Sequence, residues 1–323
     1  MRKRRIWPWI LLMVFGVTLA VALFNREWLY DFYKGMSYAP SDEMVRIRSD
    51  LDLTQRGEFW FNAAQPKLSG AGEFNAHCRP EEKTEIAVLG CYTGGEIFVY
   101  DIDAEELNGI RELTTAHELL HASWERMSGR EKDVLKPFLQ QVLNDDQGAL
   151  EEELKVYDEA EKMEELYVRA GTEIKELPNE LEEHYAEIFR DRSKVVNYYE
   201  SYIGIFRQLE AEMASLKAEM EEIESSINAK IDEYERRVAE LNAEVESFNG
   251  CAAVEGCFVS EWEFNVKRSE LLAKQAELDS FYGEIDQLIE EYNVKVELYN
   301  KDVVRTENLN QKVNSISRPE EIQ

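Results

Sequence analysis

The segment His117-Glu118-Leu119-Leu120-His121 supplies two imidazoles and one carboxylate within five positions. Residues four apart on a helix lie on the same face, so both imidazoles can reach one Zn²⁺ at about 2.0–2.1 Å. Glu118 then lies beside the metal, where it can take a proton from a water that zinc has brought to a pKa of about 7. This spacing predicts a zinc-dependent hydrolase with Glu118 as the general base.

The flanks of this motif favour a metal site on a buried helix. Ala116, Leu119, Leu120 and Ala122 are uncharged, and the motif uses two of the four histidines in the chain. The alternative interpretation is a buried helix that carries two incidental histidines.

A catalytic zinc keeps three protein ligands and one open position, so a third ligand is needed after His121. No His-x-x-Gly-x-x-His continuation follows the motif, and the downstream sequence is rich in glutamate. Glu173 ranks first because the two small residues before it allow close approach of helices. Glu165, about two helical turns earlier, ranks second, and whichever of the two does not bind metal could orient a histidine. Glu183 is a third option.

Peptide hydrolysis also needs a hydrogen-bond donor for the developing oxyanion. The sequence offers several candidates after the motif and does not select one. They are Tyr157, Tyr167, His184, Tyr185 and Arg192.

With a distant downstream glutamate, the motif resembles the gluzincin type of zinc metallopeptidase. The chain is also similar, over about residues 50 to 200, to uncharacterised bacterial membrane-anchored zincin-like proteins. Besides the zinc motif, this likeness rests on Phe74-Asn75 with Cys78, Leu89-Gly90-Cys91-Tyr92, Gly171-Thr172-Glu173, and Leu181-Glu182 with His184-Tyr185. Such proteins often have Asn-Glu-Leu-His where this chain has Glu164-Glu165-Leu166-Tyr167. The resemblance implies that Glu118 activates a water that attacks the scissile carbonyl.

A β-hairpin is predicted over residues 86 to 102, shortly before the motif. The apolar run Ile86–Leu89 and the alternating segment Glu96–Ile102 flank a turn at Gly94-Gly95. In zincins, a strand in this place forms one wall of the cleft and pairs with an extended peptide. Residues 96 to 102 are therefore expected to bind substrate by strand addition.

The four cysteines are predicted to form two disulfides, Cys78 with Cys91 and Cys251 with Cys257. An even cysteine count suits an oxidising compartment outside the cytoplasm. A second metal site is the alternative for the first pair, but no Cys-x-x-Cys spacing supports it.

The N-terminal segment is predicted to be a single membrane anchor. The basic cluster Arg2–Arg5 precedes Ile6–Phe24, which is 19 residues without a charge. A helix of this length spans about 28 Å, close to the hydrocarbon thickness of a bilayer. The basic cluster keeps the N-terminus cytoplasmic and places the main body outside, and Trp28 and Tyr30 fall at the outer interface. A cleaved signal peptide is the alternative, although Leu23-Phe24-Asn25 is not a small-x-small cleavage site.

Apolar residues repeat at spacings of 3 and 4 from Phe206 to Phe248 and again from Leu278 to Val303. One helix cannot bury such a stripe alone, and a break at Asn249-Gly250 separates the two stretches. The pattern predicts a long antiparallel coiled-coil hairpin, which serves as a spacer, binds a protein partner or mediates oligomerisation.

With 66 acidic and 37 basic residues, the net charge of −29 argues against nucleic-acid binding. The expected fold is mainly α (α+β), with a basic tip and anchor (1–25), a zincin-like domain (26–200), the hairpin (201–317) and a tail (318–323). The predicted function is a membrane-anchored extracytoplasmic zinc metallopeptidase that cleaves peptide or protein substrates. The alternative is a cell-envelope coiled-coil scaffold or adaptor with a structural or degenerate zinc site.

Overall fold

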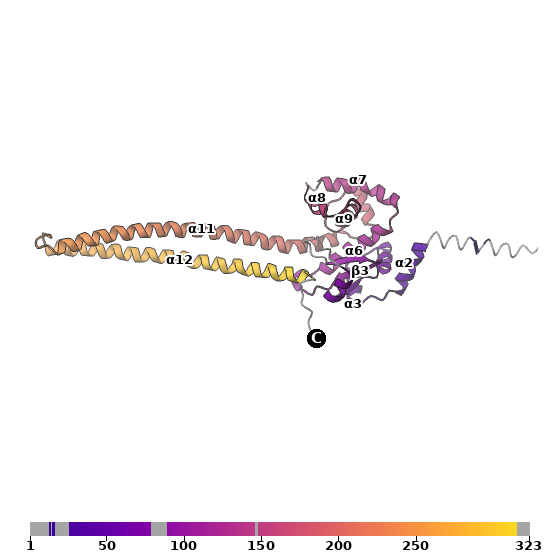
Figure 1. Ribbon diagram of the computed structural model, residues 1–323, viewed down its shortest axis with the longest axis horizontal. Helices are drawn as coiled ribbons and strands as arrows, with labels where there is room; N and C mark the ends of the chain where they lie inside the picture. The colour runs from indigo at the N-terminus through magenta and orange to yellow at the C-terminus, as the bar shows by residue number, and fades with distance from the viewer. Residues whose placement is uncertain (1–12, 14, 17–25, 79–88, 146–147, 315–323) are drawn as a thin grey trace, which may run out of the picture. The chain divides into compact units, whose positions relative to one another are not determined.

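The computed structural model describes residues 13, 15–16, 26–78, 89–145 and 148–314. The chain is mainly helical with one small sheet and one long helical hairpin, as predicted (Figure 1). It divides into two compact units, one made of Met1–Ile205 with Leu309–Gln323 and the other of Phe206–Asn308.

Short helices surround a three-stranded sheet in the first unit. In chain order, its elements are α2 (Arg26–Ser37), α3 (Asp42–Asp50), α4 (Gln55–Ala64), β1 (Lys67–Ser69), α5 (Ala71–His77), β2 (Gly90–Thr93), β3 (Glu96–Tyr100), η1 (Glu105–Leu107), α6 (Ile110–Arg126), α7 (Gly129–Asp145), α8 (Ala149–Glu153), η2 (Leu154–Val156), α9 (Glu159–Thr172) and α10 (Asn179–Tyr185).

Capping residues explain where two of these helices begin. The side chains of Ser41 and Thr54 cap α3 and α4 by accepting hydrogen bonds from backbone N–H groups three residues later.

The sheet has the strand order β1-β3-β2. Strands β2 and β3 form the predicted antiparallel hairpin, with Gly94 and Gly95 at positive φ in the turn. The part of the predicted hairpin before Leu89 lies outside the described residues. Strand β1 pairs with β3 in parallel, and this strand was not predicted from the sequence.

Strand β3 is therefore central, and the expectation that residues 96 to 102 form a free edge for a peptide is wrong. Ile97, Phe98, Val99 and Tyr100 are all buried, because this strand is covered on both faces and paired on both edges. Among the described strands, the edge that faces the zinc motif belongs to β2.

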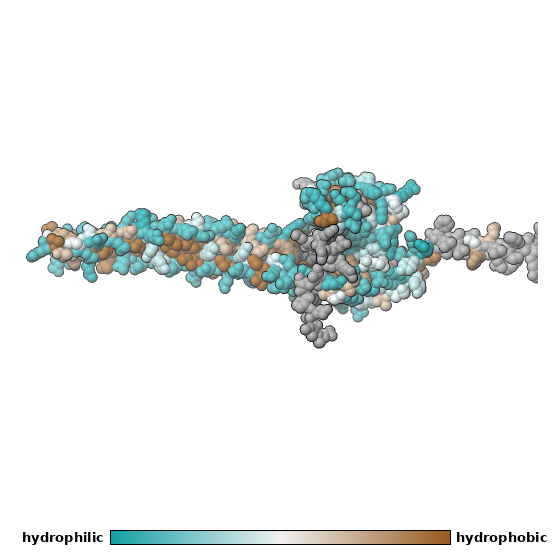
Figure 2. All heavy atoms as spheres, in the orientation of Figure 1, coloured by the Kyte–Doolittle hydropathy of each residue, from teal (hydrophilic) through white to brown (hydrophobic). Residues whose placement is uncertain are grey.

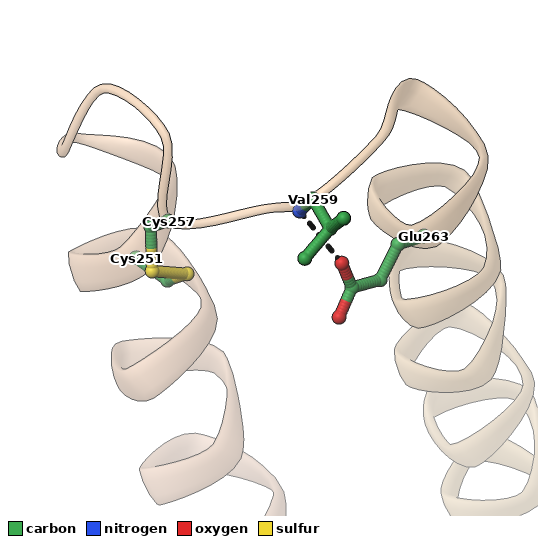
Figure 3. The surroundings of a disulfide bond; sticks show 4 residues. All are labelled: Cys251, Cys257, Val259 and Glu263. Atoms are coloured by element: carbon green, nitrogen blue, oxygen red, sulfur yellow. Dashed lines mark hydrogen bonds between the residues drawn. A yellow bond between two sulfur atoms is a disulfide. The ribbon is translucent and has the colours of Figure 1, made fainter.

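Both predicted disulfides are present. Cys78, which follows α5, is bonded to Cys91 on β2, so this bond holds the edge strand to the helix before it. Cys251 is bonded to Cys257 in the connection of the hairpin (Figure 3). Val259 lies in the same connection, and its backbone N–H donates a hydrogen bond of 2.8 Å to the carboxylate of Glu263 in the helix that follows.

The helical hairpin consists of α11 (Ser193–Ala252) and α12 (Glu261–Val313). Lys230 pairs with Glu284 at 2.7 Å, and Lys295 pairs with Glu219 at 2.5 Å, so residue numbers rise along one helix as they fall along the other. The two helices are thus antiparallel, as predicted. Hydrophobic residues lie along the hairpin between hydrophilic flanks (Figure 2).

Among the described residues, no helix is both long enough and apolar enough to cross a bilayer. The predicted anchor Ile6–Phe24 lies almost entirely outside the described residues, as does the predicted tail 318–323. The membrane anchor therefore stays a prediction.

The central helix α6 packs against β2 and β3 on one side and against α9 on the other. The contact with α9 is close at Gly171, where a β-carbon would lie 2.4 Å from Leu120 Cδ1 and 2.7 Å from Tyr185 Cε1. Ala170 and Thr172 beside it are fully buried. The small residues before Glu173 do allow close helix approach, as predicted.

We expect Gly171→Ala to lower the free energy of unfolding by about 1–3 kcal/mol, because its methyl group overpacks this contact. Gly204→Ala in α11 is the matched control, since a β-carbon there would meet nothing within 4 Å. Equilibrium urea unfolding measures both changes. Equal stability of the Gly171→Ala variant and the wild type would contradict the close packing described above.

Candidate metal centre

Helix α6 presents the two motif histidines on one face. It spans 17 residues, and the side chains of Ala116, Leu119 and Leu120 are fully buried around the motif. The rings of His117 and His121 face one another with centroids 5.1 Å apart. Their side chains are 25% and 19% exposed, so both remain reachable from a cavity.

Helix α9 brings Glu165 to the two histidines. Its Oε1 lies 3.8 Å from His117 Nε2, and its Oε2 lies 3.4 Å from His121 Nε2. One ligand atom from each of the three residues lies within 4.8 Å of the other two. Two ligands at about 2.05 Å from a tetrahedral zinc are about 3.3 Å apart, so small movements would close this set around an ion.

Glu164, the neighbour of Glu165, contacts the opposite side of one imidazole. Its Oε1 lies 2.8 Å from His121 Nδ1. With Nδ1–H donating to this carboxylate, His121 Nε2 carries the lone pair and faces Glu165. A carboxylate in this place fixes the tautomer and orientation of a metal-binding histidine. The donor set and this support both fit a zinc ion.

Glu173, ranked first as the third ligand, does not join this group. Its carboxylate, directly after the end of α9, is 3.0 Å from Arg169, which is four residues from both Glu165 and Glu173. Eight residues of helix advance by about 12 Å, and Glu173 is not part of the three-residue group, although it lines the same cavity. Burial raises the pKa of Glu173 to about 7, even though Arg169 opposes this rise. Glu183 is exposed on α10 and lies outside the group.

Glu118 is buried beside the three ligand residues. Its carboxylate accepts a backbone hydrogen bond from Tyr92 on the edge strand β2. Gly90 on the same strand makes this approach possible, since a β-carbon there would lie 2.8 Å from Glu118 Oε1 and 2.6 Å from Thr114 Cγ2. Strand β2 therefore holds the predicted base in place from the side opposite α9.

Burial and the neighbouring charges shift the pKa values of this cluster. Burial lowers the pKa of His117 to about 4, which favours the neutral imidazole that binds metals. Burial raises the pKa of Glu118 to about 7. Burial opposes the charged forms of His121 and Glu165. It is outweighed at His121 by the hydrogen bonds to Glu164 and Glu165, and at Glu165 by the hydrogen bond to His121 and the charges of the two imidazoles. The pKa of His121 is raised to about 10 and that of Glu165 is lowered to about 2.

These groups line a cavity of about 670 Å³ in the first unit. Its walls combine charged groups with apolar and aromatic side chains such as Leu113 from α6 and Tyr202 from the start of α11. Tyr157, which follows η2, lies in the same wall. Burial and the charge of Glu165 raise its pKa to about 12, so its hydroxyl remains a hydrogen-bond donor at neutral pH.

The other four candidate oxyanion donors do not line this cavity. Tyr167 is fully buried, and its hydroxyl lies 3.2 Å from Ser123 Oγ and 3.0 Å from His184 Nε2. The Tyr185 hydroxyl donates to the carbonyl oxygen of Tyr167 at 2.6 Å. Arg192 pairs with Glu182 and donates to backbone carbonyls after α9. These residues hold the fold together, which leaves Tyr157 of the five candidates.

Two contributors to the site were not predicted from the sequence. Arg169 is an ion-pair partner of Glu153 and Glu173, and it lies in the cavity wall. Its spacing of four residues from both Glu165 and Glu173 is visible in the sequence and indicates one charged helix face. The role of Glu164 was hidden, because its contact with His121 depends on how α9 packs against α6.

Comparison of the chain with protein-family models gives no match, and comparisons with curated proteins and with solved structures give none either.

Glu164→Gln is expected to weaken zinc binding by about 10–100-fold, because a neutral amide is a poorer acceptor for His121 Nδ1–H. Competition titration of the purified protein with a chromophoric zinc chelator measures this change. Glu161→Gln, an exposed position on the same helix, is the control and should bind zinc like the wild type. Unchanged affinity in Glu164→Gln would contradict the orienting role of this carboxylate.

Proposed function

We propose that this protein is a zinc-dependent peptidase whose metal ligands are His117, His121 and Glu165. The observation that carries this proposal is the meeting of three suitable ligand atoms with a buried carboxylate, Glu118, in the wall of one cavity. A purely structural zinc site would close around four protein ligands and would need no base beside it. The set of two histidines and one glutamate leaves a position open.

A bound zinc would supply a Lewis acid that polarises the scissile carbonyl and acidifies a water molecule. Glu118 then accepts a proton from the attacking water as the C–O bond forms. The same carboxylate delivers this proton to the leaving nitrogen as the C–N bond breaks. Tyr157 donates a hydrogen bond to the carbonyl oxygen while negative charge develops on it.

A peptide substrate is supported by the edge strand β2. Residues Leu89 to Tyr92 line the cavity, and no other described strand pairs with the second edge of β2. An extended peptide can add to such an edge through backbone hydrogen bonds. The disulfide at Cys91 and the contact of Gly90 with α6 fix this strand beside Glu118.

The two disulfides and the apolar run before Asn25 support action outside the cytoplasm, with the N-terminus anchored in the cell membrane. The helical hairpin would then serve as a spacer or as a protein-binding arm. The alternative is a scaffold protein that catalyses no reaction. A measurement of peptidase activity distinguishes the two proposals.

The test is hydrolysis of a quenched fluorescent peptide library by the full chain loaded with zinc. Glu118→Gln should lower kcat by at least about 100-fold, since it removes the general base, and should retain zinc. Glu58→Gln, at an exposed position of α4, is the control and should cleave like the wild type. A zinc-loaded wild type that cleaves no member of the library at any pH between 5 and 9 would favour the scaffold.

In the same assay, Tyr157→Phe is expected to lower kcat by about 10²–10³-fold with little change in KM, because it removes one oxyanion donor. Zinc content should be unchanged. Wild-type activity of Tyr157→Phe would exclude this role, and Arg169 in the cavity wall would be the next donor to test.

A further inference from the structure

Helix α2 exposes its apolar face and buries its polar face, the reverse of an ordinary surface helix in a globular protein. Such helices turn their apolar stripe towards the core and their charges towards water. In α2, the residues that are not exposed are Asp31, Lys34 and Gly35, while the large apolar and aromatic side chains point outwards.

The polar side of α2 is held firmly against the first unit. Both carboxylate oxygens of Asp31 accept hydrogen bonds from Arg126 at the end of α6, at 2.8 and 3.0 Å. Lys34 Nζ donates to the carbonyl oxygen of Gly95 in the hairpin turn at 2.7 Å. Gln65 donates to the carbonyl oxygen of Lys34 at 2.8 Å. These contacts fix which face of α2 remains outside.

The outward face is large and mostly aromatic. Its exposed members are Trp28, Leu29, Tyr30, Phe32, Tyr33 and Met36, half of the 12 residues in the helix. Tyr33 and Met36 are 71% and 73% exposed. Trp28 stacks on Phe32 and on Phe59 of α4, so the rings form one continuous apolar surface. Apolar patches of this kind mark contact with a partner or a membrane.

The position of α2 in the chain indicates what covers this face. The uncharged run Ile6–Phe24 ends two residues before Arg26, where α2 begins. If that run crosses a bilayer, α2 starts at the headgroup level, where Trp and Tyr side chains are favoured. We infer that the aromatic face of α2 lies in the headgroup region of the bilayer and docks the first unit against the lipid surface.

The lipid class follows from the charge of the chain. A net charge of −29 disfavours anionic headgroups, and the outward face itself carries no cationic cluster. Docking therefore depends on apolar and aromatic burial in a zwitterionic surface, and it should be insensitive to salt.

The experiment uses the full chain reconstituted in phosphatidylcholine vesicles. All four cysteines are in disulfides, so a new cysteine gives a unique thiol for an environment-sensitive fluorophore. Tyr33→Cys and Met36→Cys place the label on the outward face of α2. Val134→Cys on α7, which is 59% exposed, is the matched control in the same unit.

A phosphatidylcholine that carries a nitroxide near its headgroup should quench the labels at positions 33 and 36 several-fold more strongly than the label at 134. Iodide in the buffer should quench in the reverse order, at both 50 and 500 mM salt. Three results would overturn the inference. They are equal lipid quenching at all three positions, failure of the protein to float with the vesicles, and cross-linking between two copies through position 36 in place of lipid quenching.

Discussion

The packing of α6 against α9 is the contact on which the candidate site depends. Helix α6 carries both histidines and the candidate base, but the third candidate ligand and the support for His121 come from α9. The approach is close because Gly171 leaves room for Leu120 and Tyr185. Without this contact, the zinc motif would have two ligands, no orienting carboxylate and no wall opposite β2.

Charge balance explains why the acidic side chains of α9 have different roles. Glu165 is buried towards two imidazoles, and Glu173, on the same face, is neutralised by Arg169. A buried carboxylate without such a partner carries a large desolvation cost. Glu164, Glu165 and Glu118 surround His121 and raise its pKa. A divalent cation in this place would relieve the excess of negative charge and displace the proton from that histidine.

Much of this organisation could be predicted from the sequence. The helical hairpin, the β-hairpin and both disulfides follow from local spacing, and the spacing of His117 and His121 sets their shared face. Glu173 was ranked above Glu165 because small residues precede it. These residues do allow α9 to pack closely against its neighbours, but they do not bring Glu173 into the ligand group. Which turn of α9 lies opposite α6 depends on packing between segments about 45 residues apart, and no local pattern records it. Strand β1 was missed for a similar reason, because three residues carry too little periodicity to be recognised and are stabilised by their pairing with β3.

Metal content of the purified full chain after zinc loading tests the central claim most directly, with Glu165→Ala and Glu173→Ala beside the wild type. We predict about one zinc per chain in the wild type and in Glu173→Ala, and a loss of bound zinc in Glu165→Ala, since only Glu165 completes the three-ligand set. Zinc retained in Glu165→Ala and lost in Glu173→Ala would contradict the site described above. A wild type that binds no zinc would contradict the metal centre altogether.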